Sequence, residues 1–467
     1  MKVIVLFCLL GFIFFNVSAI KSEEILPWRE TVSLTNNVAR VVIDTHGGSI
    51  AAFTIEGNSY NPLNWSHPEE GNRECIRMGH FVCCDRVGGS SKKERVNGMP
   101  NHGEAGSIVW EVMEGQSPDD SLEISLQCTL PLANLSIHRK LNLWQYAPVL
   151  EVTDTVTNNN LLGRPFNILQ HQSCAPPFLS SNVIVDANVE RGFWQSTSHK
   201  KPFEPVVYWP NIEYEGIPVD LRKTFESNGP GVTNFVIKDG EEYGWTTVIN
   251  PTAGLLIGYI WKAHDYPWFR LWRSYNNGVP KAMGVEFGTT PFNFTDVDLY
   301  RIGDVFDHNV YDYLDTGDSQ DRSFTMFVIE IPGDFTGVSG VRRTFEGIEI
   351  EERGESGRII KLTQEGIITS VLTETDHNPA EKFVMAQNSP NPFNQTTTIS
   401  FTLVNAGHVD MNVYNIASQK VDTLVNDFMN AGSHSVIWDA STFSAGIYFC
   451  TVKINGLTKT RKMIYMK

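Results

Sequence analysis

The sequence predicts an all-β protein in which a large β-sandwich precedes a small one. First, stretches rich in Val, Ile, Leu and Thr follow one another from Thr31 to about Ile331, and they break at Gly, Asn and Pro. Second, few segments have the period of an amphipathic helix. Third, short alternating strands separated by turn residues resume near the C-terminus. Because 467 residues exceed one ordinary core, we expect separate domains.

The first 19 residues, "MKVIVLFCLLGFIFFNVSA", have the pattern of a secretory signal peptide. Lys2 precedes an uncharged apolar run from Val3 to Phe15, and small residues end the segment. The run is shorter than the ~20 residues that a spanning helix needs. We therefore expect cleavage after Ala19, and an exported chain with no membrane span once the signal is removed.

Charge and cysteine spacing exclude some classes of partner. The formal net charge is −16, and no basic run or nucleic-acid-binding motif occurs, which argues against a nucleic-acid partner. The cysteines after residue 19 form no repeated CxxC framework, so buried thiols or one or two disulfides fit better than a zinc site. These cysteines are Cys75, Cys83, Cys84, Cys128, Cys174 and Cys450.

The domain boundaries follow a change in composition. Between Gly347 and Glu381 the chain becomes charged and poor in aromatic residues. We expect a signal peptide at 1–19, a large β domain at 25–365, a linker at 366–380 and a small β domain at 381–467.

The C-terminal domain contains four short motifs in order: "NSPNPFN" from Asn388, "VYNIASQKV" from Val413, "GSHSVIWDAS" from Gly432 and "SAGIYF" from Ser444. In these motifs it resembles the type A sorting domain of the type IX secretion system. The resemblance implies a small immunoglobulin-like sandwich, a partner in the type IX secretion machinery, and export through the outer membrane to the cell surface or the medium.

The stretch "MGVEFGTTPF" contains a carboxylate that interrupts the end of a strand. Its period of two places Glu286 on the face opposite Met283, Val285 and Phe287, beside Gly284 and a second glycine. Glu286 either faces solvent or lines a pocket, because glycine lets a ligand approach the backbone closely.

Three further stretches carry candidate site residues. Arg86 lies in "DRVGG", and His102 lies in the loop of "GMPNHGEAGSIVW". His171 follows a strand-like run in "GRPFNILQHQSCAPPF". The segment "WKAHDYPWFRLWRSYNNGVP" holds Asp265 and Trp272 among many aromatic residues, a composition that suits a carbohydrate cleft and equally an ordinary core.

The order of these clusters from Thr31 to Ile331 resembles the galactose mutarotase-like family, which includes the aldose 1-epimerases. The resemblance implies a β-supersandwich with a cleft for a sugar or oligosaccharide. It assigns Glu286 as the general base at the anomeric hydroxyl and His171 as the general acid at the ring oxygen. Arg86, His102, Asp265 and Trp272 would bind the sugar. The reaction needs no metal and no organic cofactor.

Two other functions remain open at this stage. The same fold is also compatible with a non-catalytic carbohydrate-binding protein of a surface glycan-utilisation system, or with another carbohydrate-active enzyme such as a lyase or glycosidase, because fold does not fix function. Arg164, Arg270 and Arg273 would suit a lyase acting on a uronate, whereas the overall acidity argues against it.

Overall fold

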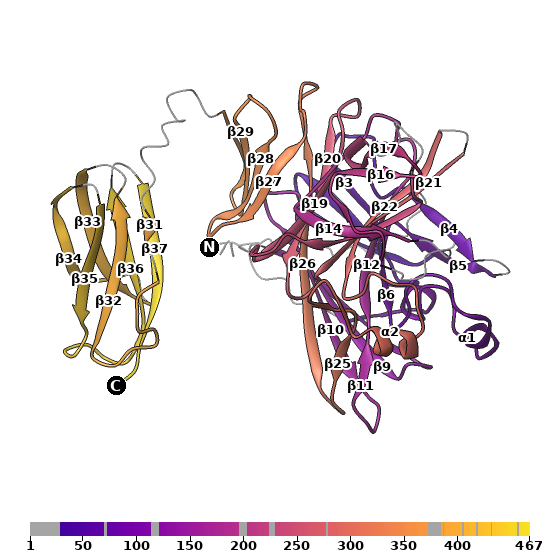
Figure 1. Ribbon diagram of the computed structural model, residues 1–467, viewed down its shortest axis with the longest axis horizontal. Coiled ribbons are helices and arrows are strands. Elements are labelled where there is room, and N and C mark those ends of the chain that lie inside the picture. Colours follow the sequence, from indigo (N-terminus) through magenta and orange to yellow (C-terminus); the bar gives the residue numbers. More distant parts are fainter. Residues whose placement is uncertain are drawn as a thin grey trace, which may run out of the picture. The chain divides into compact units, whose positions relative to one another are not determined.

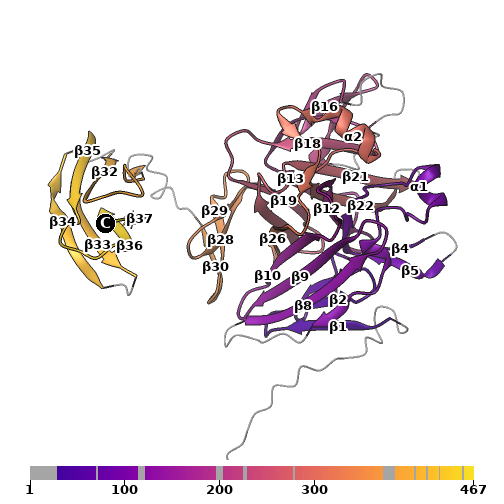
Figure 2. The same ribbon diagram turned by 90° about the horizontal axis from the view of Figure 1, so that it is seen from below.

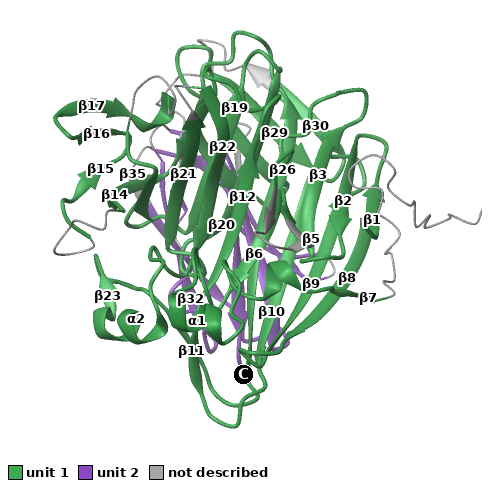
Figure 3. Ribbon diagram, turned by 90° about the vertical axis from the view of Figure 1, so that its right-hand side faces the viewer, with its two compact units in different colours: residues 1–371 green, residues 372–467 purple. Residues whose placement is uncertain are grey.

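The chain divides into two compact units, residues 1–371 and 372–467, in a computed structural model (Figures 1 and 3). The structure describes residues 29–69, 72–113, 121–195, 203–223, 229–276 and 279–371 of the first unit, and 384–385, 387–403, 406–416, 419–430, 432–454 and 457–467 of the second. The predicted signal peptide lies outside these residues. Within them, no helix is long and apolar enough to cross a membrane.

One broad antiparallel sheet makes up one face of the first unit (Figure 3). Within the described residues it has ten strands, which are, in spatial order, β1 (Thr31–Thr35), β2 (Ala39–Asp44), β3 (Ser49–Ile55), β6 (His80–Cys84), β12 (Ile168–Cys174), β22 (Val279–Gly288), β21 (Trp268–Asn276), β18 (Val232–Ile237), β14 (Val189–Trp194) and β15 (Val207–Tyr208). Glycines of positive φ, Gly47 and Gly48, make the predicted turn between β2 and β3.

A second sheet packs against the first and closes the main core. In the part of the chain that the structure describes it has eight strands, which are β13 (Ile184–Ala187), β19 (Tyr243–Asn250), β20 (Leu255–Lys262), β26 (Ser319–Glu330), β10 (Val149–Asn158), β9 (Leu135–Trp144), β8 (Ser121–Leu130) and β7 (Glu111–Met113). Figure 2 shows β8, β9 and β10 side by side. Buried side chains of both sheets form one hydrophobic cluster, as in a β-sandwich. The predicted all-β class is confirmed.

A four-stranded sheet covers the outer face of the eight-stranded sheet. Its strands are β27 (Val338–Arg343), β28 (Gly347–Glu352), β29 (Arg358–Thr363) and β30 (Gly366–Val371). Ile348, Ile350, Ile360 and Leu362 pack with residues of β19, β20 and β26 in a second core. Residues 366–371, which the sequence analysis assigned to a linker, therefore form an edge strand, and residues 372–383 lie outside the described residues.

The remaining elements of the first unit are short. The described residues include the strand pairs β4 (Ser66–Glu69) with β5 (Asn72–Met78), β11 (Arg164–Phe166) with β25 (Asp312–Leu314), β16 (Asn211–Tyr214) with β17 (Ile217–Asp220), and β23 (Asp304–Val305) with β24 (His308–Asn309). The helices are α1 (Lys92–Val96), α2 (Asp296–Ile302) and the 3-10 turns Ala105–Ser107 and Leu221–Lys223. Ser91 caps α1 through a capping box with Glu94.

The second unit is a small sandwich of two antiparallel sheets. Its strands are, in spatial order, β31 (Val384–Met385), β32 (Thr396–Leu403) and β35 (Gly432–Asp439) in one sheet, and β34 (Lys420–Met429), β33 (Gly407–Asn415), β36 (Gly446–Ile454) and β37 (Leu457–Tyr465) in the other. Phe401, Trp438, Met411 and Val452 are among the residues of both sheets that share one core. The predicted small β-sandwich is confirmed.

Thiols in both units are buried and unlinked. Cys83, Cys84, Cys128, Cys174 and Cys450, the described cysteines, are all free. Of the two alternatives that the sequence left open for these five, the structure has buried thiols.

A buried polar network ties the two large sheets together. Arg139 of β9 and Asp154 of β10 form a bidentate ion pair, with N–O distances of 2.7 and 2.8 Å and no exposed surface. Gln170 of β12, in the opposite sheet, accepts from Arg139 at 3.2 Å and donates to Asp154 at 2.8 Å. The side-chain oxygen of Gln170, Oε1, also accepts a hydrogen bond from His80 Nε2 at 3.1 Å. Because these buried groups satisfy one another, they fix which residues of β12 face inward.

Removing the cation from this network should destabilise the first unit. We expect Arg139→Met to lower the free energy of unfolding by about 3 to 5 kcal/mol, because it leaves Asp154 buried without its counter-charge. Urea unfolding followed by tryptophan fluorescence measures this loss, since Trp438 is the single tryptophan of residues 372–467.

The neighbouring lysine provides a matched control. Lys140 pairs with Glu123 on the exposed side of β9, so Lys140→Ala should cost less than about 1 kcal/mol. A loss in Arg139→Met no larger than that in Lys140→Ala would contradict the structural role of the network.

Candidate functional site

The centre of the ten-stranded sheet presents a row of polar side chains on the face away from the core. His171 of β12 lies opposite Glu286 of β22, and Glu286 lies opposite Arg270 of β21. Arg270 in turn lies opposite Asn234 of β18. Residues opposite one another on neighbouring strands point to the same face, so the strand register alone brings these four side chains together.

Glu286 lines a cavity, as one of the two interpretations of its strand predicted. Met283, Val285 and Phe287 point into the core, and Glu286 is 2% exposed at the wall of a cavity of about 740 Å³. Gly284 leaves room for the carboxylate, because a Cβ there would come within 2.9 Å of Glu286 Oε1.

His171 and Glu286 are in direct contact. His171 Nε2 lies 3.3 Å from Glu286 Oε1, and His171 Nδ1 lies 3.0 Å from Ser173 Oγ. The imidazole stacks on Phe81 with ring centroids 4.4 Å apart. Within the described residues the second carboxylate oxygen, Oε2, has no hydrogen-bond partner, and Arg270 Nη1 lies 3.9 Å from it. A buried carboxylate oxygen of this kind is a ready acceptor for a donor that enters the cavity.

Burial moves the pKa values of this pair in opposite directions. Desolvation raises the pKa of Glu286 to about 7, and Arg270 opposes the rise. Desolvation, followed by the charges of His102 and Arg270, holds the pKa of His171 well below its ordinary value. Below about pH 7 the pair therefore holds one titratable proton, which these shifts place on Glu286. Catalysis by a base and an acid requires the same one-proton state with that proton moved to His171.

Arg270 is held rigidly beside the carboxylate. Its Nε donates to Asn234 Oδ1 at 2.9 Å, Nη1 to Asn293 Oδ1 at 2.7 Å and Nη2 to the carbonyl of Pro291 at 2.6 Å. Burial lowers the pKa of this guanidinium, and Glu286 opposes the change. Arg270 thus connects Glu286 on β22 to Pro291 and Asn293 in the loop that follows this strand.

His102 approaches the pair from a loop. Its Nδ1 lies 3.3 Å from Cys83 Sγ, and its ring meets that of His171 edge-on at 5.2 Å. Its φ is +63°, a left-handed conformation that non-glycine residues rarely adopt. The cavity lining includes His102, His171 and Glu286 together, as the sequence predicted for these three residues.

The loop that carries His102 is fixed at two points. Gly103 has a φ of +78°, and a Cβ there would collide with the carbonyl of Cys84, so only glycine fits. The buried carboxylate of Glu104 accepts the backbone N–H of Leu132 at 2.9 Å and that of Ala133 at 2.9 Å.

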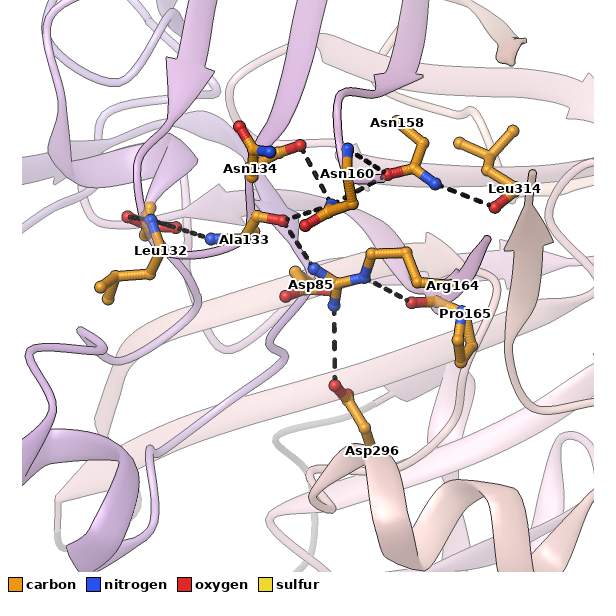
Figure 4. Close-up of polar contacts among 11 residues, drawn as sticks. Asp85, Leu132, Ala133, Asn134, Asn158, Asn160, Arg164, Pro165, Asp296 and Leu314 are labelled. Atoms are coloured by element: carbon orange, nitrogen blue, oxygen red, sulfur yellow. Dashed lines mark hydrogen bonds and ion pairs between the residues drawn. The ribbon is translucent and has the colours of Figure 1, made fainter. Parts of the chain in front are cut away.

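Arg164 binds the backbone of the turn at Leu132 and Ala133, the turn that Glu104 also binds. Arg164 lies between the carboxylates of Asp85 and Asp296, and it also donates to the carbonyl of Ala133 at 2.7 Å (Figure 4). Asp85 directly follows β6, the strand whose Cys83 contacts His102. Arg164 therefore connects the end of β6 to the turn that Glu104 binds. Arg164, which the sequence left available for a uronate, is bound within the protein.

Arg86 does not line the cavity. Its guanidinium donates to the carbonyls of Phe294, at 2.6 Å, and Gly89, and it lies 3.4 Å from Glu94 Oε2. The side chain is only 5% exposed. Arg86 therefore ties two loops at the cavity rim, which corrects its expected place in contact with a sugar.

Asp265 is likewise directed elsewhere. Its Oδ1 accepts from Arg322 Nη1 at 3.0 Å and lies 3.0 Å from His264 Nε2. It does not line the cavity, because its carboxylate is turned to an ion pair with β26. The expectation that Asp265 lies at the sugar cleft is corrected in the same way.

Trp272 lies in the cavity wall, as expected, and a second tryptophan that sequence reasoning missed lies beside it. The rings of Trp65 and Trp272 meet edge-on at 6.2 Å, and Trp65 stacks over His171 at 6.2 Å. Four other aromatic residues of the Trp272 segment are buried in the core: Trp261, Tyr266, Trp268 and Phe269. Trp65 precedes β4 in a loop, where no periodic pattern marks it.

Arg77, Lys281 and Asn293 are further lining residues that the sequence did not single out. Arg77 of β5 donates to the carbonyl of Asn101 and to Ser107 Oγ at 3.4 Å, both in the loop that carries His102. Among the described residues no group of three or more His, Cys, Asp or Glu side chains is placed to hold a metal ion.

The C-terminal unit has a recognisable family match. Residues 389–466 match the secretion system C-terminal sorting domain. This domain indicates export by the type IX secretion system to the cell surface or outside the cell. No curated protein matches the chain.

Solved structures similar to this chain match about two thirds of it. They include the Slr1438 protein from Synechocystis sp. PCC 6803, with 15% identity, a TM-score of 0.46, and coverage of 68% of this chain and 99% of that one. A galactose mutarotase related enzyme from Lactobacillus acidophilus has 15% identity, a TM-score of 0.47, and coverage of 65% and 98%. A galactose mutarotase-like protein from Clostridium acetobutylicum has 14% identity, a TM-score of 0.48, and coverage of 65% and 96%.

The buried carboxylate should make stability depend on pH. The folded-state pKa of Glu286, about 7, exceeds its ordinary value of 4.5, so its contribution to stability is full below 4.5 and is lost as pH rises through 7. Glu286→Gln removes this titration. We expect the stability of the native chain, relative to Glu286→Gln, to fall by about 3 kcal/mol between pH 4.5 and pH 8.

Urea unfolding of both chains across this pH range measures the difference. Glu190→Gln, on an exposed position of β14, is the matched control and should show no such trend relative to the native chain. A pH-independent difference between the native chain and Glu286→Gln would contradict the assigned environment of Glu286.

Proposed function

We propose that the first unit is an aldose 1-epimerase-like enzyme that interconverts the anomers of a sugar by opening and reclosing its ring. The observation that carries the proposal is the contact between His171 Nε2 and Glu286 Oε1 at a cavity wall, with Glu286 Oε2 left without a hydrogen-bond partner within the described residues. The sequence resemblance assigns the same two residues to the reaction.

The proposed reaction moves one proton onto the pair and one proton off it. Glu286 accepts the proton of the anomeric hydroxyl while His171 donates a proton to the ring oxygen. The C1–ring oxygen bond breaks and the anomeric C–O bond becomes a carbonyl. Rotation about the C1–C2 bond presents the other carbonyl face, and the reverse transfers reclose the ring. No net proton is consumed, so a pair that holds one proton is sufficient.

The neighbouring groups support this division of roles. Arg270, with Nη1 3.9 Å from Glu286 Oε2, favours the ionised carboxylate that must act as base. His102 and Arg77 line the same cavity and would bind sugar hydroxyls, while Trp65 and Trp272 would offer aromatic surface to a pyranose ring.

A non-catalytic carbohydrate-binding role is the second candidate. The two tryptophans of the cavity wall favour it, because aromatic surface binds sugar whether or not a reaction follows. Such a protein would bind sugars without accelerating anomer exchange, and the two experiments below separate the candidates.

Replacing either member of the pair should abolish most of the activity. We expect Glu286→Gln and His171→Asn each to lower kcat/KM by at least about 100-fold, the range for loss of a general acid or base. Saturation-transfer NMR on the anomeric protons of glucose, galactose and xylose, with the mature full-length chain, measures the rate.

Glu190→Gln is the control and should keep the native rate, because Glu190 is exposed on β14. A Glu286→Gln or His171→Asn chain with native kcat/KM would remove that residue from the mechanism. Binding of sugars by the native chain without faster anomer exchange would favour the carbohydrate-binding role.

Catalysis should also weaken as pH rises above neutrality. Since the pKa of His171 lies below that of Glu286, the pair loses its single proton as pH passes about 7. We expect kcat/KM, corrected for spontaneous exchange, to fall about tenfold per pH unit once pH is above this value. A corrected rate that rises steadily from pH 6 to pH 9 would contradict the one-proton pair.

A further inference from the structure

The cavity continues along β21 and β22 beyond the His171–Glu286 pair. Because every second residue of a strand points to the same face, the row after Glu286 pairs Trp272 with Gly284, and the next row pairs Ser274 with Ala282. The lining of the cavity includes Trp272, Ser274 and Ala282. The site is therefore a groove with three successive rows rather than a pocket around the acid and base alone.

The groove is longer than one sugar ring. Glu286 and Ala282 are four residues apart on β22, which corresponds to about 13 Å at ~3.3 Å per residue. The whole cavity has a volume of about 740 Å³. A pyranose whose anomeric carbon lies at Glu286 cannot span this length, so the far rows stay open beside a bound monosaccharide.

The far rows have the chemistry of a sugar subsite. Gly284 and Ala282 have little or no side chain, so they leave space in the groove above β22. A Cβ at Gly284 would come within 3.3 Å of the ring of Trp272. Trp272 forms an aromatic wall. A register shift between Ser274 and Tyr275 leaves Lys281 without a strand partner and interrupts the alternation there, so the exposed Lys281 lines the far end together with Ser274 and supplies a polar group. Aromatic surface next to a few hydrogen-bonding groups is the composition that carbohydrate sites use.

We propose that Trp272, Ser274, Lys281 and Ala282 form a second sugar subsite, so that the substrate is the reducing end of an oligosaccharide of at least two units. This inference rests on the proposed function, in which the reducing unit lies at His171 and Glu286. The second unit lies against Trp272 in the space above β22, and its hydroxyls bind Ser274 and Lys281.

Chain-length dependence of the rate tests the subsite. We expect kcat/KM for anomer exchange of the native full-length chain to be at least tenfold higher for a disaccharide than for its monosaccharide, in at least one of three pairs: glucose and cellobiose, glucose and maltose, xylose and xylobiose. In Lys281→Ala and Trp272→Ala this preference should fall at least fivefold. Lys262→Ala, an exposed lysine of β20 on the other sheet, should retain the native preference.

The results separate this inference from the proposed function. Monosaccharides turned over as fast as disaccharides in all three pairs would overturn the second subsite and leave the epimerase proposal intact. A disaccharide preference that is unchanged in both Lys281→Ala and Trp272→Ala would also overturn it.

If no sugar is accelerated, the epimerase proposal fails and the subsite is tested by binding alone. Titration of cellobiose, maltose and xylobiose, followed by tryptophan fluorescence, should then show at least tenfold tighter binding than the monosaccharides, reduced in Lys281→Ala. Equal or absent binding of both chain lengths would overturn the subsite.

Discussion

The register of β12 against β22 is the constraint on which the site depends. It places His171 opposite Glu286, and the alternation of the strand places Gln170 on the reverse face. Arg139 and Asp154 of the second sheet hold Gln170 there. The buried network and the acid–base pair therefore lie on opposite faces of the same strand, β12. A slip of one residue would turn His171 into the core and Gln170 into the cavity, because successive side chains point to opposite faces.

The buried carboxylate of Glu286 gives the site its acid–base group and lowers the stability of the fold near and above neutral pH. Glu286 is buried beside one arginine and retains an oxygen with no hydrogen-bond partner among the described residues, an arrangement that a purely structural carboxylate rarely has. Arg270 compensates part of the burial, and its own ties to Asn234 and Asn293 prevent it from closing onto the carboxylate. Unsatisfied polarity of this kind is typical of sites that bind a polar ligand.

Sequence reasoning predicted the all-β class, the small C-terminal sandwich and the inward turn of Met283, Val285 and Phe287, because these follow from local periodicity. It also placed His102, His171, Trp272 and Glu286 in one site, through a resemblance in their order. It misplaced Arg86 and Asp265, since the ion pairs and carbonyls that hold these side chains come from distant parts of the chain. It missed Trp65 in a loop, and it assigned residues 366–371, which form β30, to the linker because the composition becomes charged and poor in aromatic residues after Gly347.

In the proposed mechanism His171 and Glu286 act as one unit that shares a proton. The rate of anomer exchange in the double variant His171→Asn/Glu286→Gln, compared with the two single variants, tests this sharing. We expect the double variant to be no slower than the slower single variant, because groups that act as a unit lose their effect together. Losses that multiply in the double variant would show independent contributions and would contradict the shared-proton pair.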